Sequence, residues 1–432
     1  MSPSTQARPA LSRRRFLGGV GALGLLAACS PKPVEDGTLD VALWGDAKRA
    51  DLYQKALDVF AGTHGVLPTR LQFADLAPYL ERLATSAAAH HLPDVLWMRD
   101  THIGRYGSAG ALLDLKPYLG TTIDMSGIGE VAAADGTIDG GVCALPTHFV
   151  GQAILVARPF LERRGIDFAT VTTWDQLADA ARGSADGPSG IYGVADPTVG
   201  TTHRHLEAWI RQRGEELFRG THDVGFTAET VEEWYEYWRK LRADGIASPA
   251  DVEIEAEASG WTNDLLTTGR AAIRLASTNH LTIVQGLTKT PIGLYSIPAD
   301  SRATPDWWFF PPILISVAAT AGAPDMAVQL VNFLLNDKQA GAITKVNQGA
   351  PSSSVVRDGI VGSLTANERA FVQQISREQQ YPRRPFPVRP LGSEGFNTAI
   401  TRAGQEIAYG RVGIREAVAA LIKSAPSVLE GA

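Results

Sequence analysis

Acidic and aromatic side chains stand at or just after the ends of the first three predicted strands. In chain order they are Trp44, Asp46, Asp75, Trp97 and Asp100. Ligands of open parallel sheets bind beyond the C-terminal ends of the strands, so we expect these side chains to meet in one site. An indole ring stacks on the apolar face of a pyranose, and carboxylates hold its hydroxyl groups through charge-assisted hydrogen bonds, which are about twice as strong as neutral ones. The set therefore indicates a site for a polyhydroxylated ligand.

The segments that must position these side chains alternate between strand and helix patterns. Runs of apolar residues predict strands over 39–44, 67–73 and 93–98, and apolar residues at helical spacing predict helices over 51–60 and 78–89. This alternation is typical of a parallel sheet covered by helices, and hence of an α/β fold. Later patterns predict helices over 229–243, 325–335, 395–410 and 414–423, strands over 292–297 and 313–318, and an extended proline-rich loop over 381–390.

Length and composition limit the class of protein. A chain of 432 residues is long enough for two or more lobes, and 44% of its residues are apolar, which can fill a sizeable core. Its net charge of -6 argues against nucleic acid as a partner. The chain has two cysteines, Cys29 and Cys143. If Cys29 is modified, no internal disulfide can form, and zinc sites built on cysteine pairs are excluded.

Residues 1–29 have the layout of an export signal. Three arginines, Arg13 to Arg15, precede a short apolar run, which is about half the ~20 residues that span a bilayer. The arginine run resembles the twin-arginine export signal, and the Leu-Ala-Ala-Cys stretch that ends at Cys29 resembles a bacterial lipobox. We therefore expect a mature chain that begins at a lipidated Cys29, is anchored to the membrane by acyl chains, and continues through a flexible tether over residues 30–37.

Motifs for catalysis are weak. The histidine clusters His90-His91 and His203-Arg204-His205 lack the spacing of a metal site, and we expect surface or capping histidines there. The chain has no Gly-x-Ser-x-Gly nucleophile elbow and no phosphate-binding P-loop.

One arrangement of the carboxylates would still do chemistry. Glycoside hydrolases use two carboxyl groups that lie ~5–10 Å apart, and Asp46, Asp75 and Asp100 could approach one another. Two classes therefore remain open, a binding protein without catalytic residues and a secreted glycoside hydrolase. We favour the binding protein.

Several segments along the chain carry a family resemblance in their order and spacing. They are Tyr79-Leu80-Glu81-Arg82-Leu83 followed by Pro93-Asp94-Val95, Tyr106 to Leu115, Asp139 to Pro146, Thr172 to Leu177, Gly214 to Phe218, and Gly269 to Ile273. Together they resemble the solute-binding proteins of bacterial sugar-importing ABC transporters, in the maltose-binding family. The family usually has an acidic residue shortly after the position of Pro146, where this chain has Thr147-His148-Phe149. Its Tyr-Asn pair after the first hinge is replaced by the strand 154–159.

The resemblance implies a two-lobed periplasmic-binding-protein-like fold of type II, with the ligand cleft between lobes joined by hinge strands. It places residues 38–148 and 313–358 in the N-terminal lobe, and residues 149–312 and 359–432 in the C-terminal lobe. It implies a lipid-anchored protein with no cofactor, no metal and no catalytic residue, which acts as a monomer. Such a protein captures a mono- or oligosaccharide and delivers it to a membrane-embedded ABC permease.

The resemblance also adds ligand-binding residues to the five named above. They are His148, Asp196, Asn279, His280, Trp307, Trp308, Arg389 and Phe396. Asp196 precedes a proline, as in an acid–proline pair of the family, and Phe396 resembles a late aromatic platform. Asn279 and His280 stand where the family often has an aromatic stacker, which indicates a hydroxyl-rich or charged ligand.

Two further points concern the ligand. Trp307 and Trp308 are adjacent, so on a strand they would face opposite sides, and we expect one of them in the core and the other at the ligand. His148, His280 and Arg389 leave an alternative ligand open, a glycerophosphodiester or a glycosylated metabolite bound by the same fold.

Overall fold

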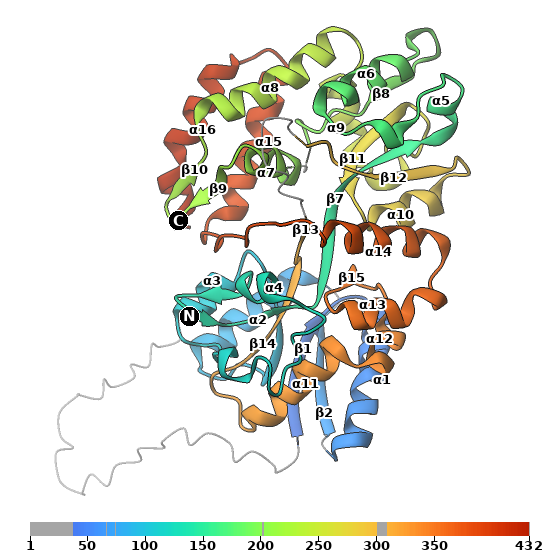
Figure 1. Ribbon diagram of the computed structural model, residues 1–432. Helices are drawn as coiled ribbons and strands as arrows, with labels where there is room; N and C mark the ends of the chain where they lie inside the picture. Colours follow the sequence, from blue (N-terminus) through green and yellow to red (C-terminus); the bar gives the residue numbers. More distant parts are fainter. Residues whose placement is uncertain (1–37, 66, 74, 201–202, 300–308, 432) are drawn as a thin grey trace, which may run out of the picture. The chain divides into compact units, whose positions relative to one another are not determined.

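The computed structural model of the protein describes residues 38–65, 67–73, 75–200, 203–299 and 309–431. This part of the chain forms two large hydrophobic cores, each built on its own β-sheet (Figure 1). The predicted signal and tether, including Cys29, lie outside the described residues, as do Trp307 and Trp308. Within the described ranges no helix is both long enough and apolar enough to cross a bilayer.

The first lobe is built on a mixed sheet. Its strands among the described residues are β1 (Thr38–Trp44), β2 (Leu67–Phe73), β3 (Val95–Arg99), β6 (Leu145–Pro146) and β14 (Ile313–Val317), in the spatial order β2-β1-β3-β14-β6. β1 runs parallel to β2 and β3, whereas β14 runs antiparallel to β3. Leu39, Val41, Ala42 and Leu43 of β1 are each at most 3% exposed. A near-continuous apolar run of this kind is what a sheet covered on both faces requires.

Helices cover the first sheet. They are α1 (Ala47–His64), α2 (Leu76–Ala88), α3 (Ile103–Ser108), α4 (Glu130–Ala134), α11 (Pro324–Asn336), α12 (Lys338–Thr344) and α13 (Ser354–Ile360), and a short hairpin of β4 (Thr137–Ile138) and β5 (Gly141–Val142) lies among them. α1 shows why the sequence folds this way. Its buried residues Tyr53, Ala56, Leu57 and Phe60 recur at helical spacing and form one apolar face.

The second lobe is built on another sheet. Its strands among the described residues are β7 (His148–Ala157), β8 (Tyr192–Val194), β11 (Ala271–Ser277) and β12 (Ile292–Ser296), with β9 (Glu216–Arg219) and β10 (Asp223–Gly225) as a separate hairpin. Its helices are α5 (Arg158–Glu162), α6 (Trp174–Ser184), α7 (His203–Gln212), α8 (Ala228–Ala243), α9 (Ala250–Ala258), α10 (His280–Leu287), α15 (Ser393–Ala408) and α16 (Ile414–Leu429). The core is aromatic. Trp174, Trp209 and Trp234 meet edge to face with ring centroids 5.1–5.8 Å apart.

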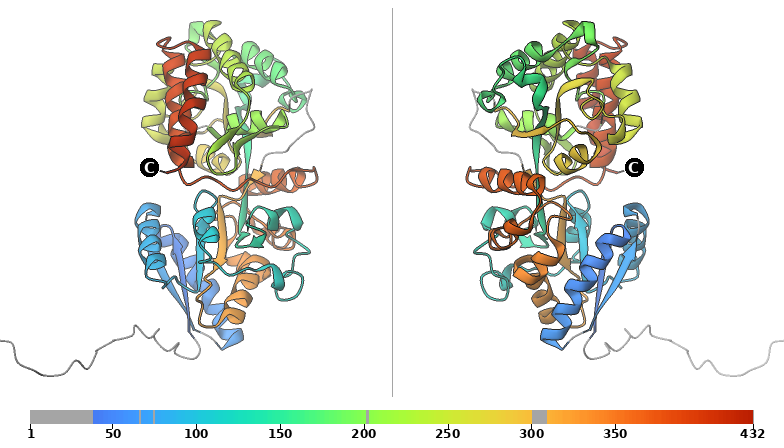
Figure 2. Two further views of the ribbon diagram at one scale, coloured as in Figure 1. Left: turned by 90° about the vertical axis from the view of Figure 1, so that its left-hand side faces the viewer. Right: turned by 90° about the vertical axis from the view of Figure 1, so that its right-hand side faces the viewer.

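β7 passes from one lobe to the other. Its first residues pair with β15 (Ala350–Pro351), its middle pairs with β13 (Phe309–Phe310), and its later residues pair with β11 and β12. Phe149 accordingly belongs to the first core, whereas Ile154 and Val156 belong to the second. The two views in Figure 2 show the lobes separated along this strand. β7 is thus one continuous hinge element shared by two cores.

α14 (Ala366–Glu378) is a further element at the boundary between the lobes. The resemblance places residues 359–432 in the C-terminal lobe. Phe371, Val372 and Ile375 of α14 nevertheless belong to the core of the first lobe. The same helix also contacts α10 and β12 of the second lobe. The core of the first lobe therefore continues beyond residue 358, because the apolar face of α14 packs on it.

Local signals in the sequence account for most element boundaries. α1 begins at Ala47, four residues before the predicted start, because the carboxylate of Asp46 accepts the backbone N–H of Arg49 at 2.8 Å and caps the helix. α6 begins in a capping box formed by Thr173 and Gln176. The loop predicted over 381–390 contains no helix or strand. α16 runs beyond the predicted end, to Leu429.

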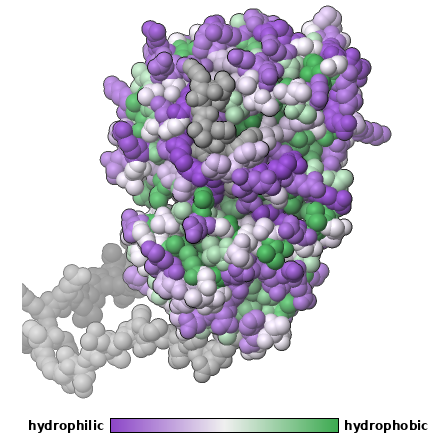
Figure 3. All heavy atoms as spheres, viewed as in Figure 1, coloured by the Kyte–Doolittle hydropathy of each residue, from purple (hydrophilic) through white to green (hydrophobic). Residues whose placement is uncertain are grey.

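Exposed apolar side chains are few and scattered over the described surface. Large apolar side chains that are clearly exposed are scattered among several elements, and include Ile283, Leu287, Tyr381 and Leu391. On the face viewed in Figure 3, hydrophobic residues lie in small groups among hydrophilic ones. This face therefore has no large apolar patch.

Two glycines inside helices predict opposite responses to the same substitution. A Cβ at Gly404 of α15 would lie 1.8 Å from the carbonyl oxygen of Thr198, so Gly404→Ala should lower the free energy of unfolding by about 1–3 kcal/mol. A Cβ at Gly62 of α1 would meet nothing within 4 Å. Gly62→Ala should therefore raise the free energy of unfolding by about 0.5–1 kcal/mol, since alanine favours helix. Urea unfolding of both variants measures the difference, and equal effects would contradict the close approach of α15 to Thr198.

Candidate ligand-binding site

A cleft of about 820 Å³ lies between the two lobes. The first lobe lines it with the end of β1, the first turn of α1 and the segment 343–349 at the end of α12. The second lobe lines it with the start of α7, the turn between β11 and α10, and the start of α15. Val150 of β7 and Phe310 of β13 add residues from the hinge. The cleft therefore lies where the sheet rule predicts a site, beyond the C-terminal end of β1.

Trp44 is the aromatic side chain of the predicted set that lines the cleft. Its ring lies 5.2 Å from that of Tyr79 and meets the ring of Trp97 edge to face at 5.4 Å. Trp44 is 8% exposed, so little more than an edge of the indole reaches the cleft. Trp97 lies behind it, against Tyr53, and does not line the cleft.

The three predicted aspartates have separate environments. Asp46 is exposed and caps α1. Asp75 is exposed at the start of α2 and does not line the cleft. Asp100 is largely but not fully buried, and its carboxylate accepts a hydrogen bond from Arg204 of the second lobe at 2.7 Å. Burial alone would raise the pKa of Asp100, but the guanidinium groups of Arg204 and Arg389 lower it below its ordinary value.

Asn279 and His280, both predicted as ligand contacts, line the cleft from the second lobe. The ring of His280 tilts against Trp261 with centroids 4.4 Å apart. The backbone N–H of Ser277 donates to Nδ1 of His280 at 3.1 Å. Burial, together with the charge of Arg274, lowers the pKa of His280 to about 4. The imidazole is therefore neutral near pH 7, and it contributes a ring and a polar tip, not a charge.

Four other predicted residues lie outside the lining of the cleft. His148 is buried at the start of β7, and burial lowers its pKa to about 3. Asp196 is buried and paired with Arg242. Phe396 is 0% exposed within the second core, with its ring 5.8 Å from that of Phe218. Arg389, predicted as a ligand contact, is instead buried and paired with Glu207.

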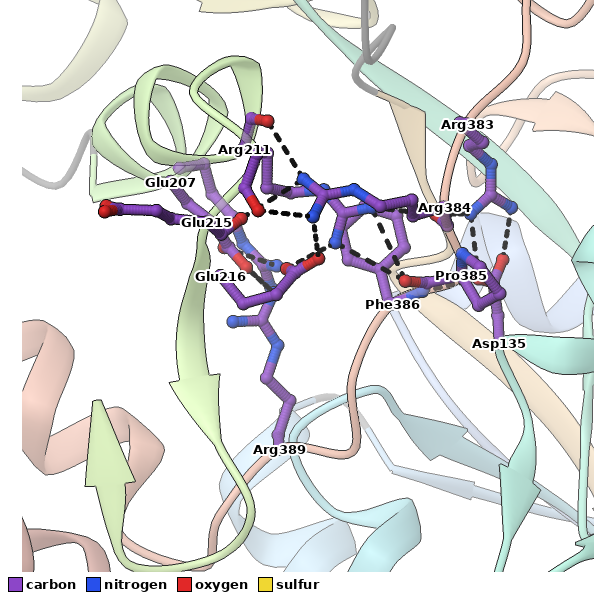
Figure 4. A network of polar contacts seen from close by, with 12 residues as sticks. Asp135, Glu207, Arg211, Glu215, Glu216, Arg383, Arg384, Pro385, Phe386 and Arg389 are labelled. Carbon is purple, nitrogen blue, oxygen red and sulfur yellow. Dashed lines mark hydrogen bonds and ion pairs between the residues drawn. The ribbon is translucent and has the colours of Figure 1, made fainter. Parts of the chain in front are cut away.

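A segment rich in arginine joins the lobes near the cleft. We name residues 381–390 the arginine strap (Figure 4). Arg383 pairs with Asp135, whose carboxylate also accepts the backbone N–H of Phe386 at 3.0 Å. Asp135 directly follows α4 of the first lobe. The strap is thereby held on the first lobe by a buried ion pair.

The other end of the strap is held on the second lobe. Arg384 donates to the carbonyl oxygens of Arg211 and Gly214 at 2.9 and 3.1 Å. Arg211 in turn donates to the carbonyl of Arg384 at 2.8 Å and pairs with Glu216 at 2.6 Å. Figure 4 shows these side chains converging from α7, β9 and the strap. Two arginines and a set of carbonyls therefore replace the backbone ladder that this irregular segment lacks.

This arrangement of two lobes, hinge and cleft agrees with the comparisons. The sequence pattern of a family described as bacterial extracellular solute-binding protein matches residues 55–368. The chain belongs to this family. The predicted family and the predicted two-lobed fold are thus confirmed, and the body of this solute-binding protein acts outside the cytoplasm.

Solved structures of the same fold cover nearly the whole body. An extracellular solute-binding protein family 1 from Alicyclobacillus acidocaldarius subsp. acidocaldarius DSM 446 is 23% identical, with a TM-score of 0.79 over 91% of this chain and 98% of that chain. A periplasmic oligogalacturonide binding protein from Yersinia enterocolitica is 17% identical, with a TM-score of 0.78 over 91% and 99%. An ABC substrate-binding protein from Listeria monocytogenes, in complex with cycloalternan, is 15% identical, with a TM-score of 0.70 over 91% and 99%.

The sequence missed several residues that line the cleft of this solute-binding protein. They are mostly basic or amide side chains, and include Lys48, Arg49, Arg204, Lys345, Asn347 and Asn397. Lys48 and Arg49 stand directly after the first strand, so the strand-end rule could have found them. No comparable signal marks Lys345 or Asn397. Lys345 directly follows α12, and Asn397 lies near the start of α15, and both are far in sequence from the predicted strands.

The expectation for the His203-Arg204-His205 cluster was wrong. His203 and Arg204 line the cleft from the start of α7, and His205 is buried. Burial lowers the pKa of both histidines to about 3, so both are neutral near pH 7. Among the described residues, no group of three His, Cys, Asp or Glu side chains is placed to hold a metal ion.

A buried carboxyl group lies against the hinge. Oε1 of Glu378 in α14 accepts hydrogen bonds from Ser296 at 2.9 Å and from Gln374 at 2.7 Å. Its Oε2 lies close to Gly151 of β7, since a Cβ at this glycine would be only 2.8 Å from Oε2. Burial raises the pKa of Glu378 from its ordinary value of 4.5 to about 7. The hinge therefore packs against a carboxyl group that is protonated in mildly acidic solution.

Glu378→Gln should change how stability depends on pH. Because the pKa is raised on folding, the protonated group stabilises the fold below about pH 4.5, and this stabilisation is lost as the pH rises through about 7. The wild type should therefore lose roughly 2–3 kcal/mol of its free energy of unfolding between pH 5 and pH 8, and the variant should not show this loss. Urea unfolding across this range measures it, with Glu81→Gln, a change at an exposed carboxyl group, as control. Parallel pH curves for Glu378→Gln and the wild type would contradict the shift.

Proposed function

We propose that the chain is the substrate-binding component of an ABC importer and captures a carbohydrate, a mono- or oligosaccharide, in the cleft between its lobes. The observation that carries the proposal is the cleft itself, which is lined by both lobes and by hinge residues. Its volume of about 820 Å³ lies within the range of about 300–1,000 Å³ that is usual for small-molecule sites. The sugar ligands named for the similar proteins from Yersinia and Listeria support the same class.

Polar side chains at the cleft suit hydroxyl groups. Asn397 is 8% exposed, and within the described part of the chain its Oδ1 makes no hydrogen bond. The Oδ1 of Asn279 is also buried and makes no hydrogen bond to the described residues. A buried amide without a partner costs free energy that a sugar hydroxyl recovers on binding. Trp44 adds an aromatic edge beside them.

Capture follows from the hinge. A ligand that touches both lobes makes its full set of contacts only when the lobes are close, so it shifts the population toward that arrangement. β7 carries the change, since it is the strand that the two cores share. The permease then recognises the closed form.

The proposal includes a lipid anchor. Residues 1–29 act as an export signal of the twin-arginine type, Cys29 carries the acyl chains, and residues 30–37 act as a tether. The body acts as a monomer. The small, scattered apolar groups on the face viewed in Figure 3 support this state.

The competing enzyme class has less support. A glycoside hydrolase needs one carboxyl group with a raised pKa to act as general acid. Asp46 caps a helix, Asp75 does not line the cleft, and the pKa of Asp100 is lowered by its arginine partners. We therefore propose binding without turnover. The alternative ligand, a glycerophosphodiester or glycosylated metabolite, is based on His148, His280 and Arg389. It has less support, because His148 and Arg389 do not line the cleft.

A ligand screen tests capture. Titration calorimetry and thermal shift with mono- and oligosaccharides should yield at least one saturable ligand that raises the melting temperature, because a ligand of the native state alone stabilises it. Asn397→Ala should lower the affinity for that ligand by about 5–10-fold, because it removes a hydrogen bond that contributes about 1 kcal/mol. Asn263→Ala, at an exposed position outside the cleft, is the matched control. Release of sugar products from glycosides would establish the hydrolase instead, and a screen without any ligand would refute capture.

Cys29→Ser tests the anchor. The variant should move from the membrane fraction to the soluble extracytoplasmic fraction, because a multiply acylated cysteine supplies ~0.8 kcal/mol of binding per buried CH₂ group. Mass spectrometry of the N-terminal peptide of the wild type should find acyl chains on Cys29. An unmodified Cys29 in the native cell would rule out the lipoprotein.

A further inference from the structure

We infer that the natural ligand carries an anionic group, a carboxylate or a phosphate, and that Lys48, Arg49 and Lys345 of the first lobe bind it. This inference rests on the proposed function, because it names the kind of saccharide that the cleft selects. It draws on the charges that line the cleft, on which of them already have partners, and on how the fold holds Arg49 in place.

The charged residues that line the cleft are mostly basic. They are Lys48, Arg49, Arg99, Arg204 and Lys345 on the basic side, against Glu368 and Glu394 on the acidic side. The chain as a whole has the opposite sign, with a net charge of -6. His203 and His280 add nothing to this balance near pH 7, because burial lowers their pKa values to about 3 and about 4. The cleft is thus a cationic pocket in an acidic protein, which attracts anions selectively.

Some of these charges are already compensated. Arg204 pairs with Asp100 at 2.7 Å, and Arg99 lies 3.8 Å from Glu394. The carboxylate of Glu368 accepts the backbone N–H and the hydroxyl of Thr365 at 2.8 Å, and so caps α14. Among the described residues, the cations of the cleft that have no ion pair are then Lys48, Arg49 and Lys345, all from the first lobe.

Arg49 is held in place by neutral groups. Its Nε donates to Oδ1 of Asn347 at 2.7 Å, and its Nη2 approaches the carbonyl oxygen of the same residue at 3.4 Å. Asp46 attracts it electrostatically, but that carboxylate accepts the backbone N–H of Arg49, at 2.8 Å. Among the described residues Nη1 has no hydrogen-bond partner and Nη2 has only this long contact, so this edge of the guanidinium can donate to an anion.

The backbone makes room for this side chain. Gly45 has φ +146°, and a Cβ there would lie 2.4 Å from Cδ of Arg49. Only glycine lets Arg49 lie across the end of β1. Arg49 is also partly desolvated, and burial lowers its pKa. An anion from the ligand would offset part of that desolvation.

Lys48 and Arg49 are poorly placed for stability. They stand in the first turn of α1, which has no acidic residue, and the positive end of the helix dipole disfavours cations there. An anion at the same place would interact favourably with the side chains and with the helix end. Lys48 makes no hydrogen bond or ion pair among the described residues, and the guanidinium of Arg49 is bonded there only to neutral groups of Asn347, so an anionic ligand would give both cations a compensating partner.

Lys345 stands in a strained conformation beside them. Its φ is 47°, in the left-handed region that a lysine rarely adopts, and such strain costs about 1–3 kcal/mol. Its ammonium group donates to the carbonyl of Ser363 at 3.2 Å, which leaves donors for a further partner. Strain of this kind is retained where a side chain must point in one direction.

Matched ligands test the inference. Calorimetry would compare glucose with glucuronate and glucose 6-phosphate, and 1,4-linked disaccharides of galactose with those of galacturonate. The acidic member of a pair should bind at least ~10-fold more tightly, as one charge-assisted contact predicts, and the gap should shrink in ~0.5 M salt. Arg49→Gln should close most of this gap, because it weakens the binding of the acidic partner far more than that of the neutral one. Arg415→Gln, which removes the same charge from a side chain that is 93% exposed, should leave the gap intact.

Stability provides a second measurement. Lys48→Gln should not lower the melting temperature of the ligand-free protein, because it removes an exposed cation from a helix N-terminus. A substantial fall for Lys48→Gln would assign this residue to the fold and overturn its role in the inference.

The outcomes separate the two proposals. Equal binding of neutral and acidic partners, or an equal loss of both in Arg49→Gln, overturns the anionic ligand and leaves carbohydrate capture standing. Binding of glycerol phosphate or inorganic phosphate without any saccharide supports the anion site and overturns carbohydrate capture. Tighter binding of glucose 6-phosphate than of any uronate assigns the group as a phosphate, and the reverse assigns it as a carboxylate. Binding of none of these probes overturns both.

Discussion

A buried charge must be compensated, and this constraint organises the boundary between the lobes. An uncompensated ion in a protein interior costs several kcal/mol, so a buried guanidinium needs a carboxylate or several carbonyl oxygens. Arg383 meets Asp135, and Arg389 meets Glu207. Arg357, by contrast, meets the carbonyl oxygens of Pro351 and Ser352.

The same constraint explains the arginine strap. Residues 381–390 have several prolines and no ladder of backbone hydrogen bonds, so they cannot join a sheet. Their arginines make the missing hydrogen bonds instead, to Asp135 on one lobe and to the backbone of Arg211 and Gly214 on the other. The strap is therefore ordered by charge, whereas β7 is ordered by its backbone pairing.

The fold could be predicted because its signals are local. The apolar run of β1 and the helical spacing in α1 each follow from a few neighbouring residues. The capping residues Asp46 and Thr173 also act within one turn of a helix. The lobe boundaries depend on distant packing and stay a prediction. α14 reads as part of the second lobe in sequence, but three of its apolar residues pack on the first core.

The site could be predicted only in part, because a binding surface is a product of tertiary structure. Trp44, Asn279 and His280 line the cleft, since they stand at strand ends that the sheets bring to the boundary. Asp196 and Phe396 have equally suggestive neighbours in sequence, yet both are buried in the second lobe. The sequence does not indicate which carboxylates will form ion pairs with arginines.

The pairing of charges also bears on the proposed closure of the lobes. Asp100 and Arg204 come from different lobes, and each side chain is 11% exposed where they meet. A buried ion pair roughly breaks even against the hydration of its separated partners. Pairs of this kind therefore specify one arrangement of the lobes without making it permanent.

The proposed closure requires a ligand that favours one arrangement of the lobes over another. A population moves from 1:99 to 99:1 when the ligand favours one state by about 5.5 kcal/mol. Among the described residues Arg49 forms no ion pair, whereas Arg204 already has one with Asp100. On the proposal of an anionic ligand, the anion would give Arg49 the partner that Arg204 already has, and this difference between the arginines would make closure depend on the ligand.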